Sequence, residues 1–333
     1  MAHHDIVAIG ASSGGVEVLI RIIAGLPEDF PAAVFVVLHV RPDAPSQLPA
    51  ILNRSGRLPA AHAVDNEPVR RGRVYVAPPG MQTYVHHGRI SVRRGPHENT
   101  YRPAIDPLFR TAAHYYGPRV VGVVLTGALD DGSAGLAMVK QAGGIAIVQD
   151  PREASFPDMP ANALRATEPD FILKSTEIAP ALVGLASNEF QAHLIPHEVA
   201  LETVEEAADP AEAFRSDQIG RPSHFVCPDC SGTLYEIDDG RSVRFRCRVG
   251  HAYSEDSMLQ SVDRSVERAL WIALRSLEER SALMIKLADL ARRRGYESLA
   301  QVYEQKSQQI ELDVRMVHSL ITAGEALEPV VHE

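Results

Sequence analysis

Apolar and polar residues follow two alternating spacings over residues 5–185. "DIVAIG" and "AAVFVVLHV" are continuous apolar runs typical of strands buried on both faces, and "VEVLIRIIAGL" between them has helical spacing. "RVVGVVLTG" and "GIAIVQD" are further strands, whereas "DPLFRTAAHYYG" and "GSAGLAMVKQAG" are helical. This alternation predicts an α/β domain over residues 1–190, with a doubly wound, mostly parallel sheet. "GRVYVAPPG" and "TYVHHGRISVRRG" are interpreted as two shorter strands forming an edge hairpin.

The pattern changes after residue 190. Residues 191–222 are acidic and rich in Ala and Glu, without strand periodicity, and are expected to be a linker. Residues 223–255 form a compact Cys/His segment, and residues 256–325 return to helical spacing with a break at Gly295. This last part predicts a helical hairpin through which the chain could form a homodimer. Its first helix carries an apolar stripe of Val262, Val266, Ala269, Ala273 and Leu277.

Composition narrows the class of protein. The 333 residues are 45% hydrophobic and carry a formal net charge of −10, which argues against a nucleic-acid partner. No segment approaches the roughly 20 apolar residues that span a bilayer, and the first apolar run lacks the features of a signal peptide. We therefore expect a cytoplasmic protein without membrane insertion.

The turn "GASSGG" after the first strand is the first candidate site. Gly10 to Gly14 match G-x-S-x-G between a strand and a helix, the context of a nucleophile elbow that exposes Ser12. The alternative is a dinucleotide-binding glycine turn. However, serine occupies the position of the second Rossmann glycine, and none of the nine tyrosines has a lysine four residues later, as short-chain dehydrogenases require. A nucleophile is the favoured interpretation.

A serine nucleophile needs a base and a group that orients this base. His39 ends the second strand, and Asp130 and Asp131 follow the strand "RVVGVVLTG". In a parallel sheet these strand ends meet at one edge, so the three residue types of a Ser-His-Asp triad would gather there. Taken singly, each has a simpler interpretation: a surface histidine, or aspartates that form a turn and cap a helix.

Six segments together resemble the catalytic domain of the chemotaxis protein-glutamate methylesterase (CheB) family. They are "IVAIGASSGGVEVL", "VVLHVRPDAPSQLPAILNRSG", "VYVAPPGMQ", "RPAIDPLFRTAA", "VVGVVLTGALDDGSAGL" and "QAGGIAIVQDPREASFPDMPANAL". The resemblance implies Ser12 as nucleophile, His39 as base and Asp131 as the triad carboxylate, with Asp130 where the family usually has asparagine. Ser13 and Ala128 would lie at the oxyanion pocket.

The implied reaction is hydrolysis of glutamate γ-methyl esters on a methylated chemoreceptor-like protein, and some members also deamidate glutamine. No cofactor is implied for catalysis. Two departures are visible: "LHVRP" replaces the family's "QHMP", and Ala128 stands where methionine is common. The elbow also begins ten residues from Met1, so no phosphoacceptor receiver domain is expected before it. These features keep a second hypothesis open, a regulatory or scaffolding protein outside chemotaxis that uses the fold for partner binding.

The Cys/His segment predicts a zinc-ribbon-like module. Cys227, Cys230, Cys247 and His251 follow the pattern Cys-x2-Cys, sixteen residues, Cys-x3-His, which suits a structural, four-coordinate Zn²⁺. "TLYEIDDGRSVRFRC" would return the chain as a hairpin that turns at Asp239 and Gly240. Alternatives are His224 as the fourth ligand, or cysteines that cluster without metal; an odd number of cysteines makes a disulfide framework a poor explanation.

Overall fold

The computed structural model describes residues 2–190, 220–238 and 242–324, which divide into a first unit, Met1–Met258, and a second, Leu259–Glu333. The predicted linker therefore lies largely outside the described residues, as does the predicted turn at Asp239 and Gly240. Within the described part, no helix combines the length and apolar character needed to cross a bilayer. The two units are described separately.

A seven-stranded, wholly parallel sheet forms the centre of the first unit, as the alternating pattern predicts. In spatial order its strands are β10 (Phe171–Leu173), β9 (Ile145–Gln149), β8 (Val120–Val124), β2 (Ile6–Ala11), β3 (Ala33–Leu38), β5 (Arg73–Val76) and β4 (Ala60–His62). Every residue of β2, β3 and β8 is buried, because helices cover both faces.

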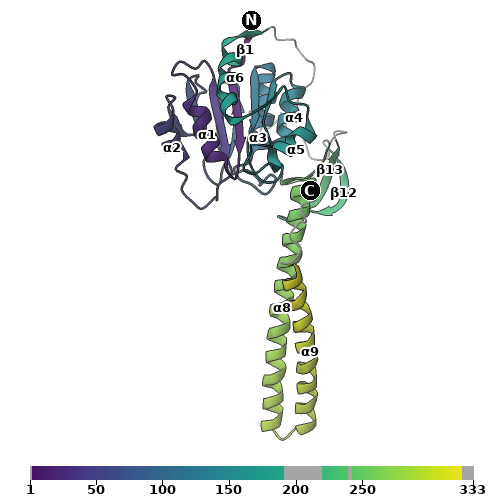
Figure 1. Cartoon of the computed structure of the whole chain (residues 1–333). Helices are drawn as coiled ribbons and strands as arrows, with labels where there is room; N and C mark the ends of the chain where they lie inside the picture. The colour runs from purple at the N-terminus through teal and green to yellow at the C-terminus, as the bar shows by residue number, and fades with distance from the viewer. Residues whose placement is uncertain (1, 191–219, 239–241, 325–333) are drawn as a thin grey trace. The chain divides into compact units, whose positions relative to one another are not determined.

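Six helices make the two outer layers (Figure 1). One layer, packed on one apolar cluster, contains α1 (Gly15–Ala24), α2 (Leu48–Ser55) and α6 (Ser175–Ser187). The other contains α3 (Ile105–Tyr116), α4 (Ser133–Gln141) and α5 (Asp158–Ala166). The earlier strands β3, β4 and β5 lie on one side of β2 and the later strands β8, β9 and β10 on the other, so the sheet has a switch point between β2 and β8, where such folds bind ligands.

The predicted edge hairpin is wrong in its pairing. The strand in "GRVYVAPPG" is β5, which lies inside the parallel sheet between β3 and β4. "TYVHHGRISVRRG" instead supplies both strands of a separate antiparallel pair, β6 (Gln82–His86) and β7 (Arg89–Arg93), which turns at Gly88 with φ of 72°. The short edge strand β4 has only three residues, so its weak pattern left β5 without an apparent second partner.

The Cys/His module is a four-stranded antiparallel sheet and belongs to the first unit. Its strands are β12 (Arg221–Val226), β13 (Thr233–Asp238), β14 (Val243–Cys247) and β15 (Ala252–Ser254). Strands β13 and β14 pair as the predicted hairpin requires. At the N-terminal end of the chain, β1 (Ala2–His3) pairs with β11 (Glu189–Phe190).

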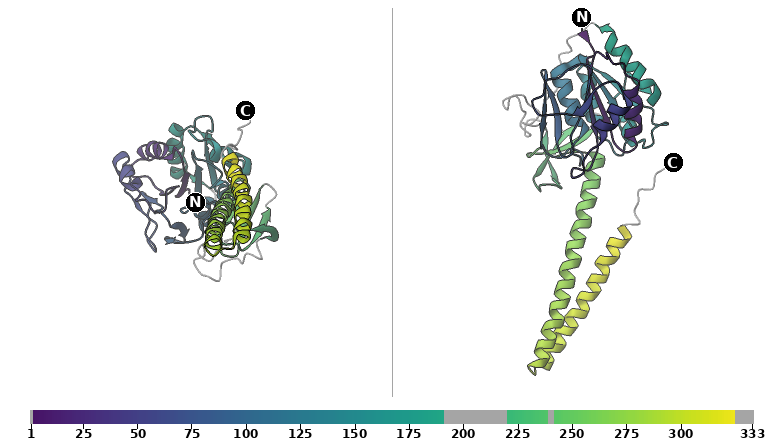
Figure 2. Two further views of the ribbon diagram at one scale, coloured as in Figure 1. Left: turned by 90° about the horizontal axis from the view of Figure 1, so that it is seen from below. Right: turned by 90° about the vertical axis from the view of Figure 1, so that its left-hand side faces the viewer.

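The second unit holds most of α8 (Glu255–Arg293) and all of α9 (Glu297–Gly324), which form the predicted hairpin around Gly295 and lie side by side in Figure 2. The predicted stripe is not its buried seam, because Val262 and Val266 are exposed. Within each helix the buried positions are three, seven or eleven residues apart, as in a coiled coil, and small side chains allow close approach. The buried members of this seam are Leu274, Ser281, Ala288, Ala291, Ala300, Ser307, Ile310 and Ile321.

Candidate active site and metal centre

Ser12 lies in the turn between β2 and α1, at the carboxyl edge of the sheet. Its N–H donates to Thr126 O at 3.0 Å and its carbonyl accepts from Gly15 N at 2.9 Å, which makes the turn tight. Gly14 has φ of 74°, a conformation that favours glycine, and a Cβ at Gly127 would come within 2.7 Å of Ser12 Cβ. Glycine is therefore favoured at position 14 of the Ser12 turn, and also at position 127 of the neighbouring loop after β8.

His39 follows β3 directly and lies beside Ser12. The parallel register pairs Ala11 with Leu38, and His39 N donates to Ala11 O at 3.1 Å, so the next residues of the two strands are neighbours. The imidazole is buried, stacked on the ring of Tyr101 with centroids 3.6 Å apart. Nε2 contacts Asp131, whereas the buried Nδ1 has no hydrogen-bond partner among the described residues. One ring nitrogen is thus available to accept a proton.

Asp131 is fully buried and accepts hydrogen bonds from several directions. Its Oδ2 lies 2.7 Å from His39 Nε2 and accepts the Ile105 N–H at 2.7 Å, and its Oδ1 accepts from Asp106 N at 3.3 Å. The carboxylate therefore lies at the N-terminus of α3, where backbone N–H groups and the helix dipole favour an anion. Burial alone would raise the pKa of Asp131, but the His39, Ile105 and Asn99 donors hold it below its ordinary value.

Sequence reasoning missed three neighbours of this pair, all in the segment before or at the start of α3. They are Tyr101, Asn99, whose Nδ2 donates to Asp131 Oδ1 at 3.0 Å, and the buried Asp106, whose Oδ2 accepts from the same Nδ2 at 2.9 Å. Burial and the neighbouring Asp131 charge raise the pKa of Asp106 to about 8. "ENTYRPAID" lies between the hairpin and a helix, and its pattern resembles that of an ordinary loop.

The remaining predicted residues lie near this edge. Asp130 makes no hydrogen bond to His39 among the described contacts; burial is the main reason that its pKa rises to about 6, while Ser254 of the Cys/His module lowers it and the charge of Asp256 in α8 raises it. Ser13 is exposed and Ala128 is half-buried in the loop after β8. Within the described residues, no hydrogen bond uses the backbone N–H of either residue. Both N–H groups are therefore available to an oxyanion.

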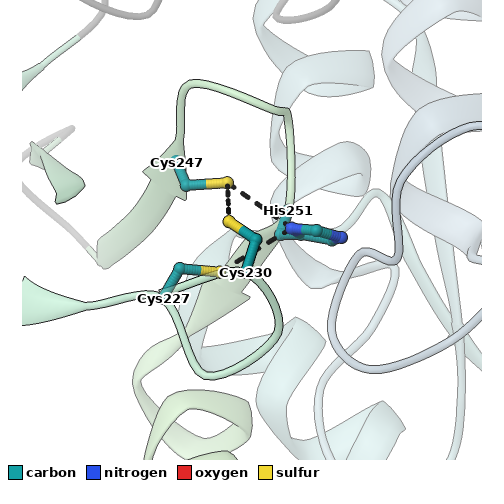
Figure 3. Close-up of side chains that lie close together, drawn as sticks. All are labelled: Cys227, Cys230, Cys247 and His251. Atoms are coloured by element: carbon teal, nitrogen blue, oxygen red, sulfur yellow. Dashed lines mark hydrogen bonds between the residues drawn. The ribbon is translucent and has the colours of Figure 1, made fainter. Parts of the chain in front are cut away.

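The four predicted metal ligands converge in the module, and Figure 3 shows their side chains turned toward one another. Cys230 Sγ lies 3.6 Å from Cys247 Sγ, and His251 Nδ1 lies 3.7 Å from Cys227 Sγ and 3.5 Å from Cys247 Sγ. In a tetrahedral zinc site, neighbouring sulfurs lie about 3.8 Å apart and sulfur and nitrogen about 3.5 Å apart. A disulfide would need about 2.05 Å, so the spacing matches a metal site far better.

A second set of donor atoms shares one of these ligands. His97, Asp229 and His251 also lie close enough to hold a cation, but His251 directs Nδ1 to the thiols of the first set. His224, the alternative ligand, lies in β12 and belongs to neither set among the described residues. Tyr253 lies beside the first set: its hydroxyl is 3.4 Å from Cys227 Sγ and donates to Asp229 at 2.8 Å.

Known proteins share the first half of this chain. Residues 7–182 match the family model described as CheB methylesterase. The chain is 34% identical over 190 residues to a putative protein-glutamate methylesterase/protein-glutamine glutaminase of Leptospira interrogans, covering 57% of this chain and 98% of that protein. It is 38% identical over 181 residues to protein-glutamate methylesterase/protein-glutamine glutaminase 2 of Anaeromyxobacter dehalogenans, covering 54% of this chain and 53% of that one.

A solved structure agrees with these matches. The crystal structure of the Thermotoga maritima CheB methylesterase catalytic domain superposes with a TM-score of 0.52 at 32% identity, covering 56% of this chain and 99% of that domain. The chain thus spans nearly all of the Leptospira protein but about half the length of the Anaeromyxobacter one. The family model, the relatives and the fold all cover the α/β domain, and the chain therefore belongs to the CheB methylesterase family.

Proposed function

We propose that this chain is a serine hydrolase that cleaves glutamate γ-methyl esters on a chemoreceptor-like protein. The observation that carries the proposal is the buried His39–Asp131 pair, 2.7 Å apart, beside the Ser12 elbow. The names of the relatives supply the reaction class, including glutamine deamidation as a second activity. The methylated helices of such receptors lie in the cytoplasm, so we place the protein there.

The proposed mechanism uses ordinary acyl-transfer chemistry. The free Nδ1 of His39 takes the proton of Ser12 as the hydroxyl attacks the ester carbonyl, and Asp131 stabilises the imidazolium that forms. Methanol leaves with the proton from His39, and water then attacks the acyl-enzyme with His39 as base again. The apo arrangement has no Ser12–His39 hydrogen bond among the described contacts, which is common before substrate binds.

We assign the developing negative charge of the carbonyl oxygen to the N–H groups of Ser13 and Ala128. Both belong to the loops that flank the switch point, and neither donates elsewhere in the described structure. Such donors contribute about 3 kcal/mol each to transition-state binding in hydrolases. Because backbone groups donate, alanine in place of the family's methionine at position 128 leaves this function available.

The test is methanol release from a methylated chemoreceptor cytoplasmic fragment, with and without prior treatment of the protein by a serine-directed phosphonate. We expect release by the untreated protein, no release after treatment, and a peptide mass that assigns one phosphonate to Ser12. Phosphonate labelling without methanol release would retain the hydrolase and exclude this substrate. If the protein is neither labelled nor releases methanol, the scaffolding alternative would be favoured. No observation on the site supports that alternative at present.

We further propose that Cys227, Cys230, Cys247 and His251 hold one structural Zn²⁺. The four donor atoms lie within 4.8 Å of one another, and four protein ligands complete a tetrahedral shell, so this metal would have no open position for catalysis. A small four-stranded sheet buries little apolar surface, and metal binding would supply much of its stability.

Metal analysis checks this assignment. The purified chain is expected to contain about one zinc per molecule, and Cys247→Ser, which removes a fully buried thiolate, is expected to lose it. Inductively coupled plasma mass spectrometry gives the ratio directly. His224→Ala is the control and should keep its zinc, because His224 lies outside the cluster. Zinc retained by Cys247→Ser but lost from His224→Ala would reverse the ligand assignment.

We also propose that the chain forms a homodimer through its helical hairpin, because large apolar side chains of the hairpin are exposed. Trp271, Ile272 and Met316 are each about half or more exposed within the second unit, at 48%, 52% and 65%. A second hairpin packed on these side chains would make a four-helix arrangement. Light scattering on the purified chain measures the mass, and a monomer at all concentrations would exclude the dimer.

A further inference from the structure

The Asn99 side chain joins the catalytic carboxylate to the Cys/His module. On one side, its Nδ2 donates to Asp131 Oδ1 at 3.0 Å and to Asp106 Oδ2 at 2.9 Å. On the other side, its Oδ1 accepts the Ser254 N–H at 3.0 Å and the Ser257 hydroxyl at 3.2 Å. Asn99 is 4% exposed, so the amide is enclosed between the two parts of the first unit.

The chemistry of these partners fixes the orientation of the amide. A backbone N–H can only donate, so the atom that faces Ser254 must be the carbonyl oxygen Oδ1. The amide NH₂ group is then turned toward Asp131 and Asp106. Both sets of partners therefore favour the same orientation, and loss of Ser254 would remove the backbone donor that holds the amide oxygen in place.

The module also holds the backbone of this segment. Asn99 N donates to Ala252 O at 2.8 Å, and residues 98 and 252 form a β-bridge. The adjacent Glu98 is 3% exposed. Its carboxylate forms ion pairs with Arg110 of α3 at 2.9 Å and with Arg246 of β14 at 3.0 Å. Buried charges of this kind are costly to separate, because removing one partner leaves the other unpaired. The contact is therefore a specific joint between the module and the site.

Asn99 also has a backbone conformation that few residues adopt. Its φ is 48°, in the left-handed region that asparagine and glycine tolerate best. The sequence thus provides a residue that can turn the chain here and carry an amide at the same time.

Resting on the function proposed above, we propose that the Cys/His module is part of the catalytic machinery: through Ser254 at its end, together with Ser257 in the first turn of α8, it fixes Asn99, a positioning residue for Asp131. The module acts on the orientation of Asp131, and through it on the His39 imidazole. The module lies outside the residues that the family model matches, and this link gives it an indirect part in the reaction.

The decisive variant is Asn99→Gly, which removes the amide and keeps the left-handed backbone accessible. We expect kcat for methanol release to fall about 10-fold to 100-fold with KM unchanged, because misplacement of a catalytic group affects the transition state. The rate of phosphonate labelling at Ser12 should fall by the same factor, while its final stoichiometry stays at that of the wild type. A purely structural role would lower the stoichiometry and leave the rate of the folded fraction unchanged.

Asn66→Gly is the matched control. Asn66 is an exposed asparagine with φ of 63°, remote in sequence from the triad residues, and the same change there should leave kcat and the labelling rate unaltered. A wild-type labelling rate in Asn99→Gly would overturn the proposal, even if Ser12 is shown to be the nucleophile. Labelling absent from the wild type would instead overturn the proposed function.

A second variant tests the contacts on the oxygen side of the Asn99 amide. Ser257→Ala removes one donor to the Asn99 oxygen, and we expect a smaller loss of kcat, about threefold to tenfold. In the double variant with Asn99→Gly, the serine change should cause no further loss of kcat, because both Ser257 and the Ser254 backbone that it contacts reach Asp131 through the missing amide. Additive losses would overturn the link through Asn99, and wild-type kcat in Ser257→Ala would overturn the part of Ser257 even if Asn99→Gly fails to fold.

Discussion

Replacement of Ser12 by alanine is expected to lower methanol release by about 10⁴-fold or more. Ser12 is 9% exposed at the carboxyl edge, in the turn between β2 and α1 where a nucleophile elbow places its serine. The substitution removes one oxygen and creates no clash, so the folded state should be retained. The measurement is kcat/KM with the methylated receptor fragment, together with a thermal melting curve.

The control for this variant is Ser276→Ala. Ser276 is exposed on α8 and its hydroxyl donates to Ile272 O within the same helix, so its loss should leave the kinetics at the wild-type level. Residual activity of Ser12→Ala within tenfold of the wild type would exclude covalent catalysis by this residue. A direct attack of water activated by His39 would then be the simpler mechanism.

Asp131→Asn is expected to cost about 10⁴-fold in kcat. The asparagine would have the size of the carboxylate but not its charge, so it could not stabilise the imidazolium of His39. Its NH₂ group would also have to face either His39 and the Ile105 N–H or the Asn99 amide, all of which approach Asp131 as donors. Steady-state kinetics on protein that melts normally would measure the loss.

Asp130→Asn provides the matched control, since the same substitution one residue earlier leaves the His39 contact intact. The kcat of this variant should stay near that of the wild type, and its free energy of unfolding should increase at neutral pH. In the folded state the pKa of Asp130 is raised to about 6 from an ordinary 3.8, so the wild type loses stability as pH rises from about 4 to about 6. Denaturant unfolding should show a larger gain at pH 7.5 than at pH 4.5, because the destabilisation of the wild type is complete only above about pH 6. Equal losses of kcat in both variants would contradict the assignment of Asp131.

Strand ends were the most informative part of the sequence. Ser12 and His39 each follow a run of six buried residues, and a parallel sheet places such ends at one edge whatever the intervening loops do. The residues alone left Asp130 and Asp131 equal, because both follow the same strand. The backbone between Leu125 and Gly132 decides which carboxylate turns inward, and Leu129 takes φ of 66° there. Local patterns do not encode such a turn.

Pairing and packing were harder to predict. In the structure, β5 pairs with β4 as well as with β3. Strand β4 has only three residues, which is too short for its sequence pattern to predict a strand. In α8, Val262 and Val266 have the spacing of a buried stripe, yet the seam uses Leu274, Ser281 and Ala288. Apolar spacing along a single helix predicts a face, but the partner helix determines which positions are enclosed.

The sequence by itself determined the parallel α/β domain, the elbow around Ser12 and the spacing of the four Cys/His ligands, because each depends on residues close together in the chain. Only the tertiary structure placed Tyr101 against His39 and brought Asn99 between the Asp131 carboxylate and Ser254. Asn99 and Ser254 are 155 positions apart. No local periodicity links residues at such a separation, and their contact exists only because the module packs on the edge of the sheet.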